Sequence, residues 1–220
     1  MTLYDNAAWH LGEDFPTDLP ETNAATHFGM FLNWCVENNL HSDDLKNQFS
    51  HEIEGLLKRN ITGAEFTLNF LDGQFTSEEL NELGNAFAKD YFVDETKFTN
   101  LHDSFANDYV NIFDAKAEES DFQYDTFYHI EDNFENYDLM KQAIDFRFQE
   151  WKEFLKEYNA GLKKDMQLGH MSCSDFRDLA AAAIYKDSQY SSWVLMVLLG
   201  HRNIATTKRY GFQRASYAES

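Results

Sequence analysis

Residues 133–158 read NFENYDLMKQAIDFRFQEWKEFLKEY, and this stretch decides the fold class. Large apolar side chains recur in it at intervals of three and four residues, at Tyr137, Met140, Ile144, Phe148, Trp151, Leu155 and Tyr158. This spacing predicts one long α-helix, because residues three and four apart share a helix face. Polar residues occupy most other positions, so we expect the helix to bury that one face against the rest of the protein.

Shorter helical patterns precede this helix. We expect helices over residues 22–40, 42–56, 80–91 and 98–109, each with apolar residues at helical spacing. The capping residues are Thr22 and Asn23 for the first, Ser42 for the second, and the pattern Thr76-Ser77-Glu78-Glu79 for the third. The apolar face of the first consists of Phe28, Phe31, Leu32, Cys35 and Val36.

Three other segments are not expected to be helical. Residues 65–70 and 122–130 are predicted to be short strands or extended connections. Residues 11–21 contain Pro16 and Pro20, which indicates an irregular segment. The sequence therefore predicts a mainly α protein: a compact multi-helix domain with short strands, and a C-terminal helical tail packed on it.

The charge of the chain changes sign along its length. The whole chain of 220 residues has a formal charge of −20. Residues 1–160 contain 10 Lys and Arg against 33 Asp and Glu, whereas residues 161–220 contain 8 against 5. The change falls near Gly161, a typical helix-terminating residue. We therefore expect two parts, an acidic helical body over 1–160 and a tail over 161–220.

An acidic body of this kind should repel nucleic acid and anionic membranes and attract a basic protein partner. General solubility is the alternative explanation of the charge. The acidic groups that we select as a partner-binding surface are Asp43, Asp44, Glu118, Glu119 and Asp121. Their simpler interpretation is as solvated helix faces.

Motifs for enzymatic chemistry are missing from the body. It has no Gly-x-Ser-x-Gly, no glycine-rich phosphate loop and no His-Glu-x-x-His. Its histidines are scattered, and His10 and His27, like Trp9, are interpreted as core and cap packing. We therefore expect no enzymatic activity, no cofactor and no metal site.

The compartment can be predicted from two further features. Two cysteines do not indicate a disulfide framework, and Cys35 lies in an apolar run typical of a core position. No basic and apolar leader and no run of about 20 apolar residues occurs. These features favour a cytoplasmic protein that does not enter a membrane.

The body resembles a known family through three segments: Tyr4–His10, Asp14–Pro20 and Ala25–Trp34. They are similar to an uncharacterised family of small acidic bacterial proteins, and the resemblance covers roughly residues 1–160. It implies no catalytic residues. The small, acidic character is similar to that of immunity proteins, which neutralise toxins delivered between bacteria.

The tail contains a different pattern. Arg177 is followed by Leu199-Gly200-His201, and Tyr210 stands nine residues after His201. This resembles the C-terminal end of the catalytic domain of tyrosine recombinases, the phage integrase family. The resemblance implies that Tyr210 would be the nucleophile toward a DNA phosphate, with Arg177 and His201 as phosphate ligands.

The tail departs from that family in ways that oppose activity. The family's histidine three residues before the arginine is Ser174 here, and the upstream catalytic arginine and lysine have no counterpart. The acidic body also opposes the attraction on which DNA binding depends. We therefore interpret Arg177, His201 and Tyr210 as remnants and expect no productive DNA binding.

Together, these observations predict a non-catalytic acidic binding protein, namely an immunity protein with a cognate toxin as its basic partner. The alternative is a protein derived from a mobile element that affects DNA transactions, as an inactive recombinase fragment or a DNA mimic. A hydrolase with scattered carboxylates is a third class, which would need a pocket that gathers several acidic groups.

Overall fold

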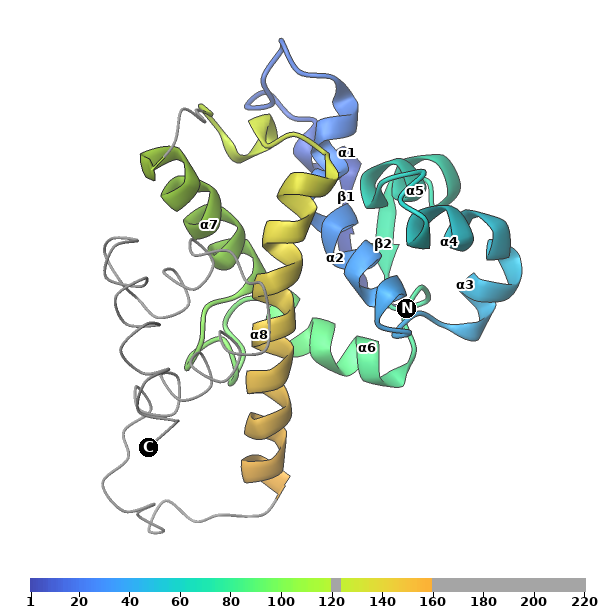
Figure 1. Cartoon of the computed structure of the whole chain (residues 1–220), viewed down its shortest axis with the longest axis vertical. Coiled ribbons are helices and arrows are strands. Elements are labelled where there is room, and N and C mark those ends of the chain that lie inside the picture. Colours follow the sequence, from blue (N-terminus) through green and yellow to red (C-terminus); the bar gives the residue numbers. More distant parts are fainter. Residues whose placement is uncertain (120–123, 160–220) are drawn as a thin grey trace, which may run out of the picture.

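The computed structural model describes residues 1–119 and 124–159, and this part of the chain is mainly helical, as predicted. In chain order its elements are β1 (Leu3–Asn6), α1 (Ala7–His10), the 3-10 helix η1 (Glu21–Ala25), α2 (Thr26–Glu37), α3 (Asp43–Gln48), α4 (Ser50–Leu57), α5 (Gly63–Phe70), β2 (Gln74–Thr76), α6 (Glu82–Phe87), the π-helical segment η2 (Ala88–Phe92), α7 (Phe105–Glu119), the 3-10 turn η3 (Phe127–His129) and α8 (Phe134–Asn159). Figure 1 shows how these elements are arranged. The predicted helical tail and its packing lie outside the described residues.

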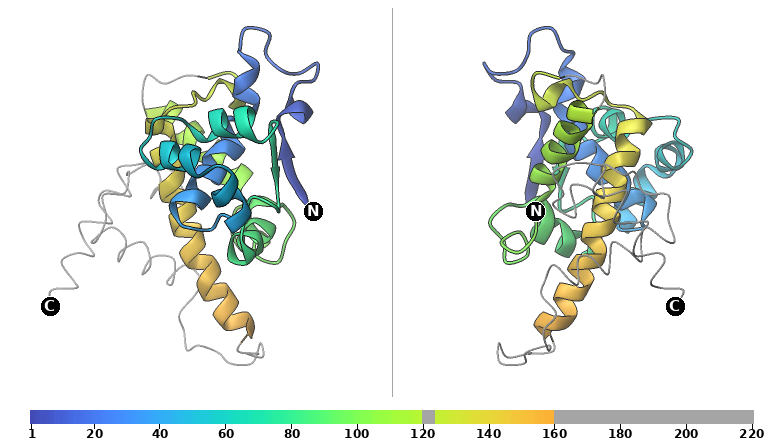
Figure 2. Two further views of the ribbon diagram at one scale, coloured as in Figure 1. Left: turned by 90° about the vertical axis from the view of Figure 1, so that its right-hand side faces the viewer. Right: turned by 60° about the vertical axis from the view of Figure 1, so that its left-hand side comes forward.

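Helix α8 confirms the long helix predicted from residues 133–158. Tyr137, Met140, Ile144 and Trp151 of its apolar face are buried, with exposed fractions of 3% or less. The helix contacts both α2 and α7. Figures 1 and 2 show its C-terminal end extending beyond the other described elements. Helix α8 therefore joins early and central parts of the chain in one core.

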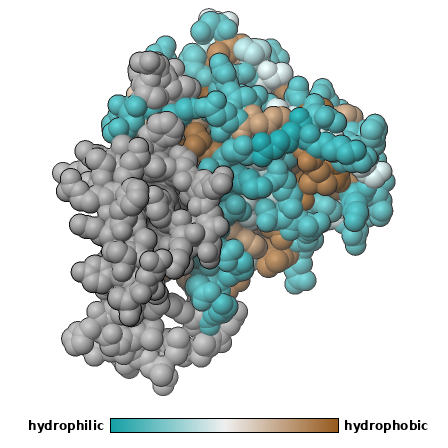
Figure 3. All heavy atoms as spheres, viewed as in Figure 1, coloured by the Kyte–Doolittle hydropathy of each residue, from teal (hydrophilic) through white to brown (hydrophobic). Residues whose placement is uncertain are grey.

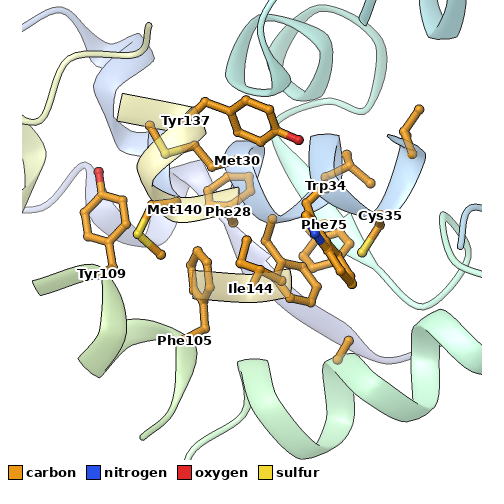
Figure 4. Packing of buried hydrophobic residues seen from close by; sticks show 14 of the residues in the cluster. Phe28, Met30, Trp34, Cys35, Phe75, Phe105, Tyr109, Tyr137, Met140 and Ile144 are labelled. Atoms are coloured by element: carbon orange, nitrogen blue, oxygen red, sulfur yellow. The ribbon is translucent and has the colours of Figure 1, made fainter. Parts of the chain in front are cut away.

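Helix α2 lies at the centre of that core. All five residues of its predicted apolar face are buried, with exposed fractions of 0% or 1%. Figure 4 shows Phe28 and Trp34 of α2 among side chains of β2, α7 and α8. Each large apolar side chain that is withdrawn from water contributes roughly 1.5–3 kcal/mol to stability. Many of the aromatic residues in the described part of the chain are therefore buried inside the fold.

Helices α2 and α5 meet backbone to backbone at two glycines. A Cβ atom on Gly63 would lie 1.9 Å from the carbonyl oxygen of Gly29. A Cβ atom on Gly29 would lie 2.4 Å from the backbone nitrogen of Ala64. Neither position can accept a side chain without separating the two helices.

The prediction of a strand or extended connection over residues 65–70 is wrong, because a capping box starts a helix there. The backbone N–H of Glu65 donates to Thr62 Oγ1 at 3.2 Å, and the N–H of Thr62 donates to Glu65 Oε2 at 2.8 Å. This reciprocal pair satisfies two N–H groups at the start of α5. The resulting helix buries Phe66.

The short strands lie elsewhere. Strands β1 and β2 form a two-stranded antiparallel sheet, in which Leu3 lies opposite Thr76 and Asn6 lies opposite Gln74. The segment from residue 124 to 130 contains the turn η3, and residues 122–123 are outside the described part. The sheet ties the start of the chain to the segment between α5 and α6.

Several helix boundaries differ from the prediction. The first expected helix is divided into η1 and α2, and the second into α3 and α4. The Thr76–Glu79 pattern caps a turn and not a helix. The N–H of Thr76 donates a hydrogen bond to Glu79 Oε2 at 2.5 Å in that turn. Helix α6 starts later, because Asn81 caps it by accepting from the N–H of Gly84 at 2.9 Å. The helix expected over 98–109 is observed over Phe105–Glu119.

The visible surface of the described part is mainly polar. Hydrophilic residues cover most of the coloured surface in Figure 3, with smaller apolar areas between them. Among the residues that the structure describes, no helix has the length and apolar character needed to cross a bilayer. Cys35 is fully buried, as its apolar neighbours predict, and burial raises the pKa of its thiol.

Candidate functional site

Three side chains from different elements meet near the start of the chain. Asp5 lies in β1, His10 ends α1, and His27 lies in the first turn of α2. His10 Nε2 donates to Asp5 Oδ1 at 2.8 Å, and His27 Nε2 donates to Asp5 Oδ2 at 3.0 Å. We call these three residues the His-Asp-His cluster.

Local structure fixes the carboxylate of this cluster. The N–H of Asn6 donates to Asp5 Oδ1 at 2.7 Å, and the Asn6 side chain caps α1 by accepting from the N–H of Ala8 at 2.9 Å. The N–H of Ala7 donates to the carbonyl oxygen of Gly73 at 2.9 Å. The turn from β1 into α1, which carries both Asp5 and His10, is thereby held against the segment before β2.

Burial and hydrogen bonding determine the charge state of the cluster. Burial acts to raise the pKa of Asp5, but the hydrogen bonds from His10 and His27 outweigh it and hold this pKa far below its ordinary value. Burial lowers the pKa of His27, and the opposing attraction of Asp5 only partly offsets this. At neutral pH, the cluster therefore contains a carboxylate and a neutral imidazole at His27.

Aromatic rings surround the two histidines. The His10 and His27 rings lie 4.7 Å apart between centroids and are nearly perpendicular, and Phe127 lies 5.6 Å from His27. Tyr128 Oη lies 3.1 Å from His10 Nδ1. The side chains of His10, His27 and Asp5 are 19%, 13% and 12% exposed, so the cluster is shielded but still reaches the surface.

The cluster has the chemistry of a metal site. Its three potential ligand atoms lie within 4.8 Å of one another. Among the residues that the structure describes, no other group of three His, Cys, Asp or Glu side chains comes this close together. Sequence reasoning interpreted His10 and His27 as packing residues and did not select Asp5. The signal was weak, because Asp5, His10 and His27 do not follow the spacing of a metal-binding motif.

The predicted partner-binding residues fall on two separate faces. Asp43 and Asp44 are exposed in the first turn of α3, and Glu118 and Glu119 are exposed at the described end of α7. Figure 1 shows α3 and α7 on opposite sides of α8. Asp121 lies outside the described residues. The four described residues therefore do not form one continuous surface.

The recombinase-like residues Arg177, His201 and Tyr210 also lie outside the described part of the chain. Their roles as remnants stay a prediction.

A buried charged group that sequence reasoning missed connects α7 and α8. Arg147 donates to Asp108, Asp103 and Glu150, and Tyr91 Oη donates to Asp108 at 2.9 Å. Arg147 and Asp108 are 1% and 0% exposed. A signal was present, because Arg147 stands three residues after Ile144 and four before Trp151, on the apolar face of the helix. Its burial gives it a structural role.

Comparison with known proteins yields one match. A family model described as "Domain of unknown function (DUF7832)" matches residues 3–126, more than half of the chain. The match falls within residues 1–160, the part that we expected to form the acidic body. Comparison with curated proteins and with solved structures gives no match.

Proposed function

The chain belongs to the DUF7832 family, whose description states no activity, and on this premise we propose that it is a non-catalytic protein that binds a basic protein partner. The observation that supports this proposal most strongly is the distribution of charge in the folded body.

The body neutralises much of its own positive charge internally. At least six of the ten Lys and Arg residues in 1–160 form ion pairs with its own carboxylates, namely Lys58, Arg59, Lys116, Lys141, Arg147 and Lys156. The 33 acidic residues therefore leave a large surplus of negative charge. Such a surplus attracts cationic surfaces and accelerates association with them.

The helix dipole accounts for the negative charge at the start of α3 but not for that at the end of α7. Asp43 and Asp44 lie in the first turn of α3, where the helix dipole favours negative charge. Glu118 and Glu119 lie at the described end of α7, where the same dipole disfavours it. Neither Glu forms an ion pair with another described residue. A basic partner would offset this local cost, so we assign the main docking face to the end of α7.

The partner class that we propose is a bacterial toxin with a cationic, phosphate-binding surface. An acidic protein that covers such a surface blocks it without any chemistry of its own. This step rests on the similarity in size and charge to immunity proteins, together with the charge distribution of the body.

The test is binding to the product of the adjacent gene, measured by calorimetry at low and high salt. We expect binding at micromolar concentration or tighter that weakens as salt rises, because salt screens exposed charges. The double variant Glu118→Lys/Glu119→Lys should weaken binding. The matched control Glu78→Lys/Glu82→Lys changes the net charge equally at two other exposed residues and should bind like the wild type.

The proposal fails if the neighbouring gene product does not bind. Equal weakening by both double variants would show a general charge effect and would remove the docking face from the proposal. The alternative function, in DNA transactions, rests on Arg177, His201 and Tyr210, and a DNA adduct that is lost in Tyr210→Phe would favour it.

A further inference from the structure

The His-Asp-His cluster combines two imidazole nitrogens and one carboxylate at ligand-forming distance. From this geometry we infer that Asp5, His10 and His27 form a binding site for a divalent transition-metal ion of the Zn²⁺ type. This inference does not depend on the proposed partner-binding function.

The ligand types select the class of ion. Imidazole suits zinc, copper, nickel and iron, whereas magnesium and calcium prefer sites made entirely of oxygen atoms. Two histidines with one carboxylate also make up a common ligand set of sites that keep open coordination positions. The partial exposure of His10 leaves a route for an ion and for water molecules that complete the coordination.

The cluster must rearrange its side chains locally to accept the ion. Zinc ligands lie about 2.0–2.2 Å from the metal, so two ligands of a tetrahedral ion lie roughly 3.4 Å apart. The hydrogen-bonded atom pairs of Asp5 with His10 and His27 are 2.8 Å and 3.0 Å apart. Each of these two pairs needs an opening of about 0.4–0.6 Å. The ligand atoms of His10 and His27 lie within 4.8 Å of each other, so the two rings must also turn toward one shared position.

The protons of the cluster can be accounted for. In the metal-free state, each Nε2–H donates to Asp5, so each Nε2 must lose its proton before it can donate a lone pair to the ion. The neutral imidazole keeps one proton, which moves to Nδ1 by exchange with solvent. For His10, the resulting Nδ1–H donates to Tyr128 Oη, which lies 3.1 Å away. Asp5 has no proton to lose at neutral pH, because the ordinary pKa of an aspartate is about 4.

The surroundings supply the support that metal ligands require. Ligating histidines usually hydrogen-bond through their second nitrogen, which fixes the ring orientation. Tyr128 occupies that position for His10, and it is tied to η1 because the side chain of Asn23 donates to its carbonyl oxygen at 2.8 Å.

The competing explanation is a hydrogen-bonded cluster that only fastens β1 and α1 to α2. The variant His10→Gln separates the two explanations. A glutamine amide can still donate to Asp5, but it is a poor zinc ligand, so the fold is retained while the metal site is lost. His10→Ala removes both interactions. His51→Ala, at an exposed position in α4, is the matched histidine control.

The experiment uses the full chain after removal of metal with a chelator, followed by titration with zinc chloride. Calorimetry and elemental analysis give affinity and stoichiometry, and Co²⁺ absorption reports the coordination geometry. We expect His10→Gln and His27→Gln to lose one equivalent of zinc relative to wild type while keeping the wild-type circular dichroism spectrum. Tyr128→Phe should weaken zinc binding by about 10–100-fold.

Any zinc that binds elsewhere on the chain is the same in every variant, so the difference from wild type reports this cluster alone. Equal zinc stoichiometry in wild type, His51→Ala and both Gln variants would overturn the site, as would the absence of zinc binding by the wild type. Neither result affects the partner-binding proposal, which is tested separately by binding to the product of the adjacent gene.

Discussion

Arg147 and Asp108 are joined by two hydrogen bonds at a position almost closed to water. Arg147 Nε donates to Asp108 Oδ2 at 2.7 Å, and Nη2 donates to Oδ1 at 2.8 Å. The pair connects α8 to α7, and Asp103 and Glu150 contact the same guanidinium group. A buried ion pair of this kind is costly to break from one side, because the remaining charge stays buried.

Asp108→Ala should therefore lower the free energy of unfolding by about 3–5 kcal/mol, measured by urea denaturation. The double variant Asp108→Leu/Arg147→Met should lose less stability than Asp108→Ala, because no buried charge is left unpaired. Glu54→Ala, which breaks the exposed pair with Lys58, is the control and should leave the midpoint unchanged. Equal destabilisation by Asp108→Ala and Glu54→Ala would contradict the structural role of the buried pair.

Gly63→Ala should destabilise the protein by about 1–3 kcal/mol or more, because its Cβ would overlap the Gly29 carbonyl oxygen and overpack the contact between α2 and α5. Thermal denaturation measures the effect. The matched control is Gly55→Ala in α4, whose Cβ would meet only the side chain of Ile61, at 3.4 Å. That change should be neutral or stabilising, because alanine favours a helix. A neutral Gly63→Ala would show that the two backbones are not in contact.

Asp132 gives the fold a pH dependence of known sign. Burial, with a smaller contribution from Glu65, raises its pKa to about 6, although the hydrogen bond from Thr62 opposes this. Between about pH 4 and pH 6, the folded state keeps a proton that the unfolded state releases. The contribution of Asp132 to the free energy of unfolding therefore falls as pH rises through this window.

Asp132→Asn removes that dependence and retains an acceptor for Thr62. At pH 7 we expect the variant to be more stable than wild type by at most roughly 3 kcal/mol. Below pH 4 the two should be equally stable. Urea denaturation across this pH range measures the difference, which isolates Asp132 from the other buried carboxyl groups. A constant difference at every pH would contradict the assignment.

Sequence periodicity predicted the elements whose stability comes from one apolar face. The face of α8 through Tyr137, Ile144 and Trp151, and the face of α2 through Phe28 and Phe31, are buried as expected. These predictions succeeded because helical spacing can be recognised in the local sequence without knowledge of tertiary contacts. Residues 65–70 were assigned wrongly because the capping box at Thr62 was not recognised.

The candidate metal site could not be predicted in the same way. His10 and His27 meet only because the turn from β1 into α1 places Asp5 between them, and that turn depends on the contact of Ala7 with Gly73. The spacing of residues along the sequence cannot predict a tertiary contact of this kind. The acidic residues were visible in the sequence, but their division between α3 and α7 required the fold.

Asn81→Ala tests the observed start of α6. The substitution removes the acceptor for the N–H of Gly84 and the donor to the carbonyl oxygen of Asn39, so we expect a loss of about 0.5–2 kcal/mol in stability. Asn81→Ser keeps a capping oxygen and should lose less. Chemical denaturation ranks the three proteins. If Ser and Ala are equally destabilising, the cap does not contribute to stability.

Helix α8 lies outside the family match but belongs to the same core. The family match ends at residue 126, yet α8 begins at Phe134 and supplies Trp151 and Arg147 to the same core. Asp145 accepts from the indole of Trp34 at 2.7 Å, within the matched region. A protein cut at residue 126 would expose the apolar side of α2 to water. The matched region of this chain therefore depends on α8, which lies beyond it, to keep the apolar side of α2 away from water.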